Sequence, residues 1–413
     1  MNGIWLAFAC APPLAGLLGL AVRHHRRLSA LWREPTLAVP VLIVESDDWG
    51  PGEVADADAL RRLAELLEAR RDARGAVAVM TLGVVAAAPD GAAILAGGCR
   101  RYRRCTLAEP RFAAIVDAIR HGIRGGVFAL QRHGTEHCWP AALMARLHVD
   151  PSLRDWLGGP TGHTEALPDE LQSRWVDGGS LPSRELDEAE VAAAVADEVA
   201  LLQQTFGERP RVAVPNTFVW SAAVERAWMA SGVVFVVTPG RRFGGRDAGG
   251  GLIVAERGLL NGGQGATGAR YVVRDDYFEP LRGHAAGFAL AAVAGKWAQR
   301  RPCLLESHRD NYNRGQPSEA AFAELERLLD AALARLPELR FVSTETLAGQ
   351  IAAGRGELIS TRTSIRVEGW LARLLVEPEF ARLLKYSGLR WLVAGAHAAL
   401  RSVNSGRFRC GAN

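Results

Sequence analysis

Residues 37–353 show two alternating patterns of hydrophobic and polar positions. Short apolar runs rich in β-branched residues predict buried strands, and longer segments with apolar residues three or four positions apart predict helices. Strands are expected at 37–44, 76–85, 126–130, 211–214, 233–237, 271–274, 303–306 and 341–342. Helices are expected at 53–71, 112–120, 188–206, 222–231, 318–336 and from about 344. This alternation favours parallel βαβ units, in a barrel or an open sheet.

Two later segments depart from this pattern. Residues 241–268 are Gly-rich without the spacing of a phosphate-binding loop, so they predict a long surface loop or hairpin. Over 370–403, Trp, Leu, Phe and Tyr are interleaved with Arg and Lys, which predicts amphipathic helices. We expect this appendix to pack on the main domain, the alternative being that it lies on a membrane surface.

The N-terminus predicts a membrane-associated segment. Residues 4–22 are almost wholly apolar and long enough to cross a bilayer, although Pro12 and Pro13 interrupt them. No Lys or Arg precedes the segment, as a secretory signal would require, and three follow it: Arg23, Arg26 and Arg27. That bias would keep the following domain on the cytoplasmic side. An ordinary buried helix in a cytoplasmic protein is the alternative.

Composition narrows the class of protein and of partner. The 413 residues are 48% hydrophobic and 23% charged, which is typical of a globular chain. The net charge of +4 is small, and the basic residues are scattered among acids, so we expect no nucleic acid partner. The six cysteines form no CxxC pair. A Cys99–Cys105 disulfide is possible in an exported protein, but free thiols are favoured.

Three polar clusters each follow a predicted strand. Asp47 and Asp48 end the first, His133 and His137 follow a middle one, and His308 follows a late one. Carboxyl ends of parallel strands converge on one site, so we expect these side chains to meet.

The residue types in these clusters are those of a catalytic metal site. Adjacent buried carboxylates repel, and a metal ion relieves the repulsion when one Asp binds it and the other stays a base. Two His four positions apart lie on one face of a helical turn and can bind one ion. An Asp-His-His set leaves a coordination position open for water, as catalytic sites do.

Together these motifs resemble the polysaccharide deacetylases, or NodB-type carbohydrate esterases, and more closely a bacterial polysaccharide-(de)acetylase-like group. The resemblance rests on Val44 to Gly50, Gln131 to His137 and His308 to Tyr312, and on Ala88-Pro89-Asp90, Pro215-Asn216 and Val219-Trp220 between them. It spans about 39–354 and implies a distorted (β/α) barrel. The implied segments are an N-terminal apolar segment at 1–35, the barrel at 36–355 and a helical appendix at 356–413.

The resemblance also implies a role for each residue. Asp48, His133 and His137 would hold a divalent metal, most simply Zn²⁺. Asp47 would be the general base, and His308 the general acid that protonates the leaving amine. A carboxylate would orient the His308 ring, with Asp275, Asp276 and Asp310 as candidates. Substrate contacts are expected at Trp49, Pro215, Asn216, Arg309 and Tyr312, and one or two of Trp49, Trp139, Trp220 and Tyr312 would stack on sugar.

The chain departs from the family pattern at two positions. Gly134 stands where Ser or Thr follows the first metal His, and Val214 stands where an Arg precedes Pro. That Arg normally orients the catalytic Asp, so another is needed, with Arg132, Arg309 and Arg241 as candidates.

The expected function is metal-dependent removal of N-acetyl, less readily O-acetyl, groups from a polysaccharide or glycan precursor. One alternative is a related barrel that cleaves another C–N or glycosidic bond. Asp47 and Asp48 are too close in sequence for the separated carboxylates of retaining glycosidases. The other alternative is a non-catalytic, membrane-associated protein that binds or assembles glycans and retains the metal site.

Overall fold

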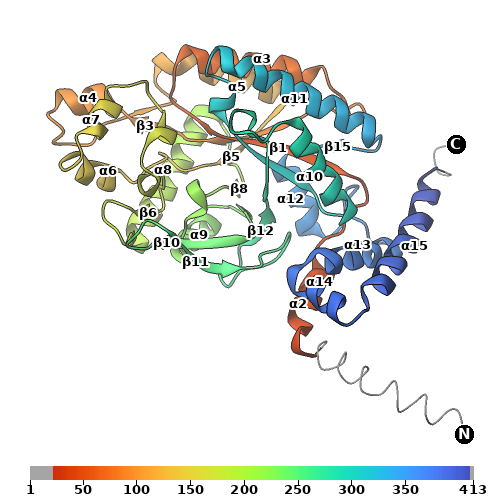
Figure 1. Cartoon of the computed structure of the whole chain (residues 1–413). Helices are drawn as coiled ribbons and strands as arrows, with labels where there is room; N and C mark the ends of the chain where they lie inside the picture. Colours follow the sequence, from red (N-terminus) through yellow and green to blue (C-terminus); the bar gives the residue numbers. More distant parts are fainter. Residues whose placement is uncertain (1–21, 410–413) are drawn as a thin grey trace, which may run out of the picture. The chain divides into compact units, whose positions relative to one another are not determined.

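The chain divides into two compact units. The computed structural model describes residues 22–409 (Figure 1). Leu37–Ile359 form the larger unit, and residues 22–36 with 360–409 form a smaller helical one. Nearly all of the apolar segment predicted at 4–22 lies outside the described residues. Among residues 22–409, no helix is both long and apolar enough to cross a bilayer.

The larger unit is built around one sheet in which every strand pair is parallel. Across the sheet the order is β12 (Arg270–Val273), β9 (Phe235–Thr238), β8 (Val212–Ala213), β5 (Phe128–Arg132), β2 (Met80–Val84), β1 (Val41–Trp49), β14 (Cys303–His308) and β13 (Asp276–Tyr277). A short strand, β15 (Arg340–Phe341), also pairs with β1.

The two edges of this sheet are brought together by the chain itself. β12 and β13 stand at opposite ends of the hydrogen-bonded order, yet only Arg274 and Asp275 separate them in sequence. A link of that length spans about 10 Å at most, so the sheet curls until its edges nearly meet. The predicted distorted (β/α) barrel is therefore confirmed, with a seam between β12 and β13.

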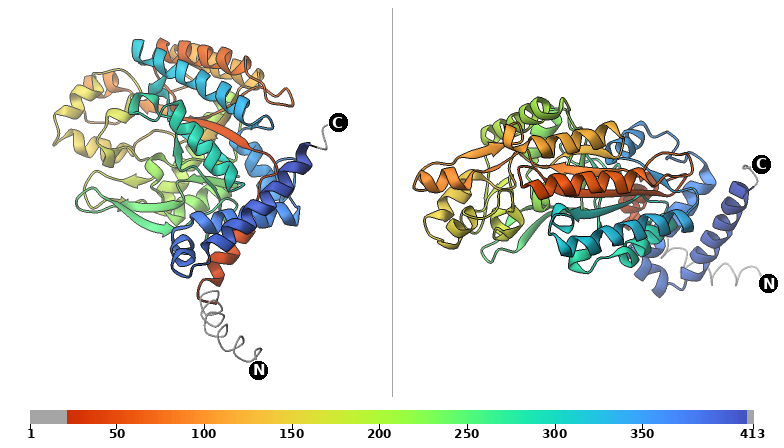
Figure 2. Two further views of the ribbon diagram at one scale, coloured as in Figure 1. Left: turned by 45° about the vertical axis from the view of Figure 1, so that its right-hand side comes forward. Right: turned by 90° about the horizontal axis from the view of Figure 1, so that it is seen from above.

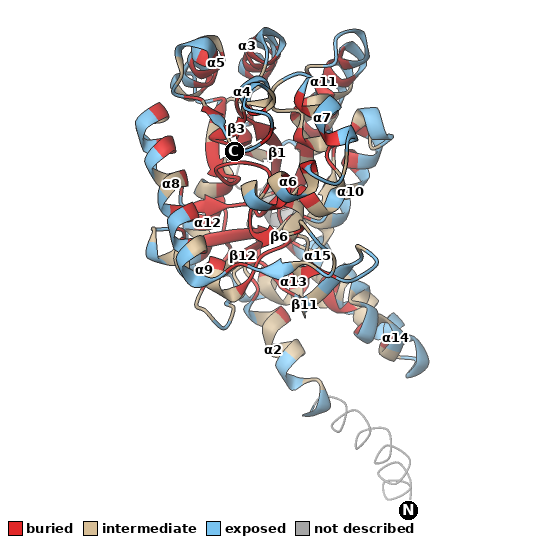
Figure 3. Ribbon diagram, turned by 90° about the vertical axis from the view of Figure 1, so that its left-hand side faces the viewer, coloured by how far each residue is buried: buried red, intermediate tan, exposed pale blue. Residues whose placement is uncertain are grey.

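Helices cover the outer face of the sheet. The first set is α3 (Val54–Glu68), α5 (Ala113–Arg124), α8 (Glu188–Phe206) and α9 (Ala222–Ala230). The second is α10 (Ala286–Ala298), α11 (Gln316–Arg335) and α12 (Thr344–Ala353). Figure 2 shows α5, α3 and α11 side by side, and ion pairs such as Arg62–Glu319 join α3 to α11. Their apolar sides are buried against the strands while their outer sides face solvent (Figure 3).

The predicted helices and strands of this unit are all present, with ends that differ by up to five residues. α8 begins and ends as predicted because Asp187 caps its first turn with Glu190, and Gly207 ends it in the left-handed conformation. The Gly-rich segment forms the predicted hairpin, β10 (Arg241–Arg246) with β11 (Leu252–Arg257).

The short elements were not predicted because they lack a clear period. They are β13, α4 (Gly91–Ala96), α6 (Pro140–Leu147), α7 (Ser152–Leu157), the pair β3 (Ala87–Pro89) and β4 (Arg104–Thr106), and the pair β6 (Val176–Asp177) and β7 (Arg184–Glu185). The longer helix α10 was not predicted either. Cys99 and Cys105 are buried free thiols, as favoured, and form no disulfide.

The smaller unit contains α2 (His25–Arg33), α13 (Thr363–Val376), α14 (Pro378–Tyr386) and α15 (Arg390–Arg409), so the helices predicted over 370–403 are present. The buried Arg373 joins α13 to the end of α2. Its guanidinium donates to the carbonyl oxygens of Leu31 at 3.2 Å, Glu34 at 2.9 Å and Pro35 at 2.8 Å. A cation at a helix C-terminus satisfies carbonyls that the helix leaves unpaired.

We expect Leu305→Ala in β14 to lower the free energy of unfolding by about 2–5 kcal/mol, because the fully buried side chain would leave a cavity. Urea unfolding followed by circular dichroism measures the change. Leu252→Ala, at a 40% exposed position of the hairpin, is the control and should shift stability by less than about 0.5 kcal/mol. Equal losses in the two variants would contradict the packing described for β14.

Candidate active site

A cavity of about 280 Å³ opens at the carboxyl ends of the strands. Its lining combines acids, imidazoles and two arginines with a small apolar surface. The lining residues are Asp47, Asp48, His133, His137, Glu165, Asp169, Gln172, Pro215, Thr217, Phe218, Arg274, Arg282, Glu306 and His308. All five residues to which the sequence assigns catalysis or metal binding are among them.

An irregularity in β1 turns both aspartates into this cavity. Neighbouring residues of a regular strand point to opposite faces. The register of β1 with β2 shifts between Ser46 and Trp49, and Asp48 has a φ of 71°. Asp and Asn tolerate this left-handed conformation better than other non-glycine residues. The bulge therefore places adjacent carboxylates in one pocket.

Asp48, His133 and His137 form a compact set of three ligands. One Asp48 carboxylate oxygen lies 3.0 Å from Nε2 of His133 and 3.1 Å from Nε2 of His137. The three ligand atoms all lie within 4.8 Å of one another, and all three side chains are buried. Nδ1 of His133 lies 2.9 Å from the Val214 carbonyl oxygen, so Nδ1–H donates there and Nε2, on the Asp48 side, is left as the ligand atom. These donors fit a divalent cation with an open position.

The two histidines do not lie on a helical turn, so that part of the prediction is wrong. Residues 133–137 form an irregular bend after β5. Gly134 has a φ of 89°, and a Cβ there would lie 3.0 Å from Asn216 Oδ1. Gly134 is thus required by this bend. The bend brings the two imidazole rings to 5.1 Å between centroids.

The arginine that holds Asp47 is Arg274, in the seam of the barrel. Its guanidinium donates to Asp47 at 2.6 Å, donates to Glu45 at 2.8 Å and lies 3.3 Å from Glu306. The same guanidinium lies over the Phe218 ring, 5.3 Å from its centroid.

None of the three arginines proposed from the sequence fills this role. Arg132 donates to the Pro210 carbonyl and to Ser231, and Arg309 donates to the Gly162 carbonyl. The Arg241 guanidinium lies over Phe243.

The three carboxyl groups around Arg274 differ in the direction of their pKa shifts. Burial raises the pKa of Asp47, but Arg274 and the two nearby imidazoles, His133 and His308, outweigh burial and hold that pKa below its usual value. For Glu45 and Glu306 burial prevails over the attraction of Arg274, and each pKa is raised. The arrangement therefore favours Asp47 as the ionised member.

The second oxygen of Asp47 is unpaired and aimed at a glycine. Oδ1 is buried and has no hydrogen-bond partner among the described residues. A Cβ built on Gly83 of β2 would lie 2.3 Å from this oxygen. A hydrogen is thus the only side chain that fits at Gly83 without moving Asp47.

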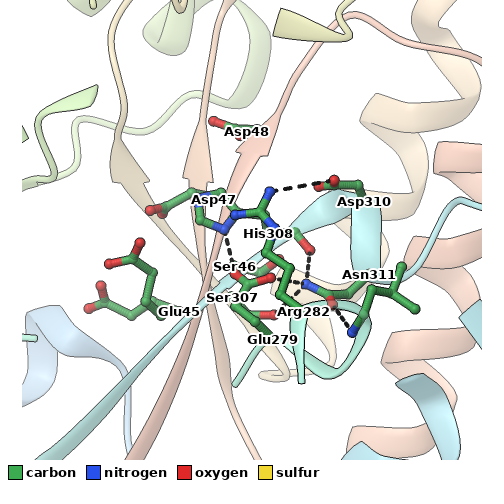
Figure 4. A network of polar contacts seen from close by, with 12 residues as sticks. Glu45, Ser46, Asp47, Asp48, Glu279, Arg282, Ser307, His308, Asp310 and Asn311 are labelled. Atoms are coloured by element: carbon green, nitrogen blue, oxygen red, sulfur yellow. Dashed lines mark hydrogen bonds and ion pairs between the residues drawn. The ribbon is translucent and has the colours of Figure 1, made fainter. Parts of the chain in front are cut away.

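The carboxylate that orients His308 is Glu279, which the sequence did not single out. Glu279 Oε1 pairs with Nδ1 of His308, and Asn311 donates to the other oxygen of Glu279 at 2.7 Å (Figure 4). Burial lowers the pKa of His308, but Glu279 and Asp48 outweigh burial and raise that pKa to about 10.

The three candidates named from the sequence have other partners. Asp275 and Asp276 pair with Lys296, and Asp310 pairs with Arg282 and Arg314. Glu279 stands 29 residues before His308, and no local pattern marks it.

Of the predicted substrate residues, only Pro215 lines the cavity. Trp49 donates to Ser46, Asn216 donates to the His133 carbonyl, and Arg309 and Tyr312 are buried. Substrate contact at these positions stays a prediction, and their present contacts are structural. Trp139 and Trp220 do not line the cavity either; its aromatic side chain is Phe218.

No protein-family model matches the chain, and no curated protein matches it. Among solved structures, a family 4 acetyl xylan esterase from Clostridium thermocellum with a cobalt ion is 13% identical, with a TM-score of 0.37, covering 77% of this chain and 94% of that one. A family 4 carbohydrate esterase from Streptomyces lividans with acetate is 10% identical, with a TM-score of 0.31, and the match covers 74% of this chain and 91% of that one. A 4-alpha-glucanotransferase from Thermococcus litoralis is 11% identical, with a TM-score of 0.37, and the match covers 86% of this chain and 48% of that one. Similarities at this level assign neither a family nor an activity.

We expect His137→Gln to lower the affinity for Zn²⁺ or Co²⁺ by at least about 100-fold. Removing a side chain that only hydrogen-bonds to a metal ligand typically lowers metal affinity by about 10–100-fold, and removing a ligand itself lowers it further. Calorimetric titration of the metal-free protein measures the change. His121→Gln, on the exposed side of α5, should leave the affinity unaltered. A weak site in the native chain, or equal affinity in both variants, would contradict the assignment.

Proposed function

We propose that the larger unit is a metal-dependent deacetylase that removes acetyl groups from a glycan. The observation that carries the proposal is the grouping of the Asp48, His133 and His137 ligands with Asp47 and His308 in one cavity. This set supplies a cation site, a base and an acid, which are the three elements that amide hydrolysis needs.

The three ligands would hold a divalent cation, and Zn²⁺ is the ion we expect. When bound, such a cation polarises an acetyl carbonyl and lowers the pKa of water to about 7. Asp47 is placed to take a proton, because Oδ1 is buried without a partner while Arg274 holds the other oxygen. The fixed carboxylate loses little freedom when it acts as the base.

His308 is placed to give a proton to the leaving group. Glu279 fixes the ring through Nδ1, which leaves Nε2 as the nitrogen available for transfer. With a pKa raised to about 10, the ring is protonated at neutral pH. A departing amine needs that proton more than an alcohol does, which favours N-acetyl over O-acetyl substrates.

The size and lining of the cavity support a small acyl group. A volume of about 280 Å³ admits one acetylated sugar residue but little more. Pro215 and Phe218 provide the apolar surface that an acetyl methyl group would contact. The acids and arginines around them can hydrogen-bond sugar hydroxyls. A polysaccharide or glycan precursor is therefore the substrate class we infer.

A non-catalytic protein that binds or assembles glycans is the second candidate, because it could retain the same ligands. Cation binding without acetate release from varied acetylated glycans would favour it.

We expect acetate release from N-acetylated glycans in the presence of zinc, cobalt or nickel. Asp47→Asn should lower the rate by about 10²–10⁴-fold, the usual contribution of a general base, while the cation stays bound. Enzymatic determination of acetate measures the rate, and O-acetylated glycans belong in the same panel. Asp58→Asn, on the exposed side of α3, is the matched control. Loss of the ion in Asp47→Asn would overturn the division between base and ligand.

We expect Glu279→Gln to move the alkaline limb of the pH–rate profile to lower pH. The Glu279 carboxylate raises the pKa of His308, so a neutral amide lets the ring lose its proton at a lower pH. Rates from about pH 6 to about pH 11.5 locate the limb, because in the native chain it lies near the His308 pKa of about 10. Asp275→Asn, which alters a partner of Lys296, should leave it in place. An unmoved limb in Glu279→Gln would exclude His308 as the acid.

A further inference from the structure

The helical unit carries a large excess of basic residues. Residues 22–36 and 360–409 contain 13 Arg and Lys against 4 Asp and Glu, a formal net charge of +9. The whole chain has a net charge of +4, so the remaining residues have a net charge of −5. Such a contrast between two parts of one chain is typical of a part that binds a polyanionic surface.

The turn between α14 and α15 exposes aromatic and basic side chains together. We call residues 385–392 the aromatic–basic tip. Tyr386 is 83% exposed and Trp391 is 71% exposed, although large aromatic side chains are usually mostly buried. Lys385 and Arg390 stand next to them in sequence and are exposed as well. The tip thus offers amphipathic rings and cations at one place.

The described chain begins beside this tip. An open hollow of about 660 Å³ is lined by His24, Glu379, Arg382, Leu383, Tyr386 and Ser387. His24 also lies 3.5 Å from Glu379 and packs edge-on against Phe380. Val22, two residues earlier, is 64% exposed and ends the apolar run that starts at residue 4. Val22 therefore lies two residues before His24, which lines the same hollow as Tyr386 of the tip.

We propose that the aromatic–basic tip docks on the surface of a lipid bilayer that contains anionic lipids. Trp and Tyr prefer the headgroup level of a bilayer, where one end of the ring is apolar and the other is hydrated. Lys and Arg beside them are attracted by anionic headgroups. The exposed aliphatic Leu392, together with the apolar run that precedes His24 in the sequence, favours a bilayer over a nucleic acid, which would need cations and stacking rings alone.

The chain offers a direct probe of this contact because it has only two lysines, Lys296 and Lys385. Lys296 is largely buried and paired with Asp275, whereas Lys385 is exposed in the tip. We expect vesicles of phosphatidylcholine and phosphatidylglycerol to protect Lys385 of the full chain severalfold from a water-soluble acylating reagent. Mass spectrometry of the digested protein measures the labelling. Vesicles of phosphatidylcholine alone should give much less protection.

A double variant tests how much the tip contributes to vesicle binding by the whole chain. Arg390→Glu with Trp391→Ser should lower partitioning onto the anionic vesicles by at least about tenfold, measured by flotation. Arg327→Glu with Leu252→Ser makes the same charge reversal, and replaces another exposed hydrophobic side chain by Ser, in the larger unit; it should have little effect.

Three results would overturn the proposal. One is unprotected Lys385 in a chain that floats with the vesicles, which would assign binding to the apolar run. Another is equal partitioning of the two double variants. The third is protection of Lys385 by a short DNA strand but not by vesicles, which would indicate a nucleic acid partner.

Discussion

The guanidinium of Arg274 faces three buried carboxylates, and the chemistry of the cavity depends on how that one charge is divided. A single cation cannot balance three anions where water is excluded. The division favours Asp47, which also lies near two imidazoles, over Glu45 and Glu306. A carboxylate that stays ionised in a buried site is the result, and its second oxygen has no hydrogen-bond partner among the described residues.

The barrel assembles these groups from distant parts of the chain because all of them stand at the same ends of parallel strands. Asp47 and His308 are register partners in neighbouring strands, β1 and β14. The histidine ligands follow β5, and Arg274 comes from the seam. Asp47 and His308 are fixed by backbone that pairs with neighbouring strands, so little ordering of these two groups remains when a ligand arrives.

The sequence located the strand ends well and the supporting contacts poorly. Asp47, Asp48, His133, His137 and His308 could be found because each follows an apolar run whose period is clear. Arg274 and Glu279 could not be found in this way. Each is distant in sequence from its partner, Asp47 or His308, and the two pairs form only when the sheet curls. The bend at 133–137 was misassigned for a similar reason. HxxxH spacing suits a helix, and only the positive φ of Gly134 brings the rings together without one.

The two-residue link between β12 and β13 also limits how this barrel can diverge. Inserting or deleting one residue there would rotate or withdraw the guanidinium and leave its carboxylates without a counter-charge. The segment over 140–187, which contributes Glu165, Asp169 and Gln172 to the cavity lining, can therefore vary while the seam keeps its length. A conserved spacing between these strands would mark homologues that retain the chemistry more reliably than overall identity does.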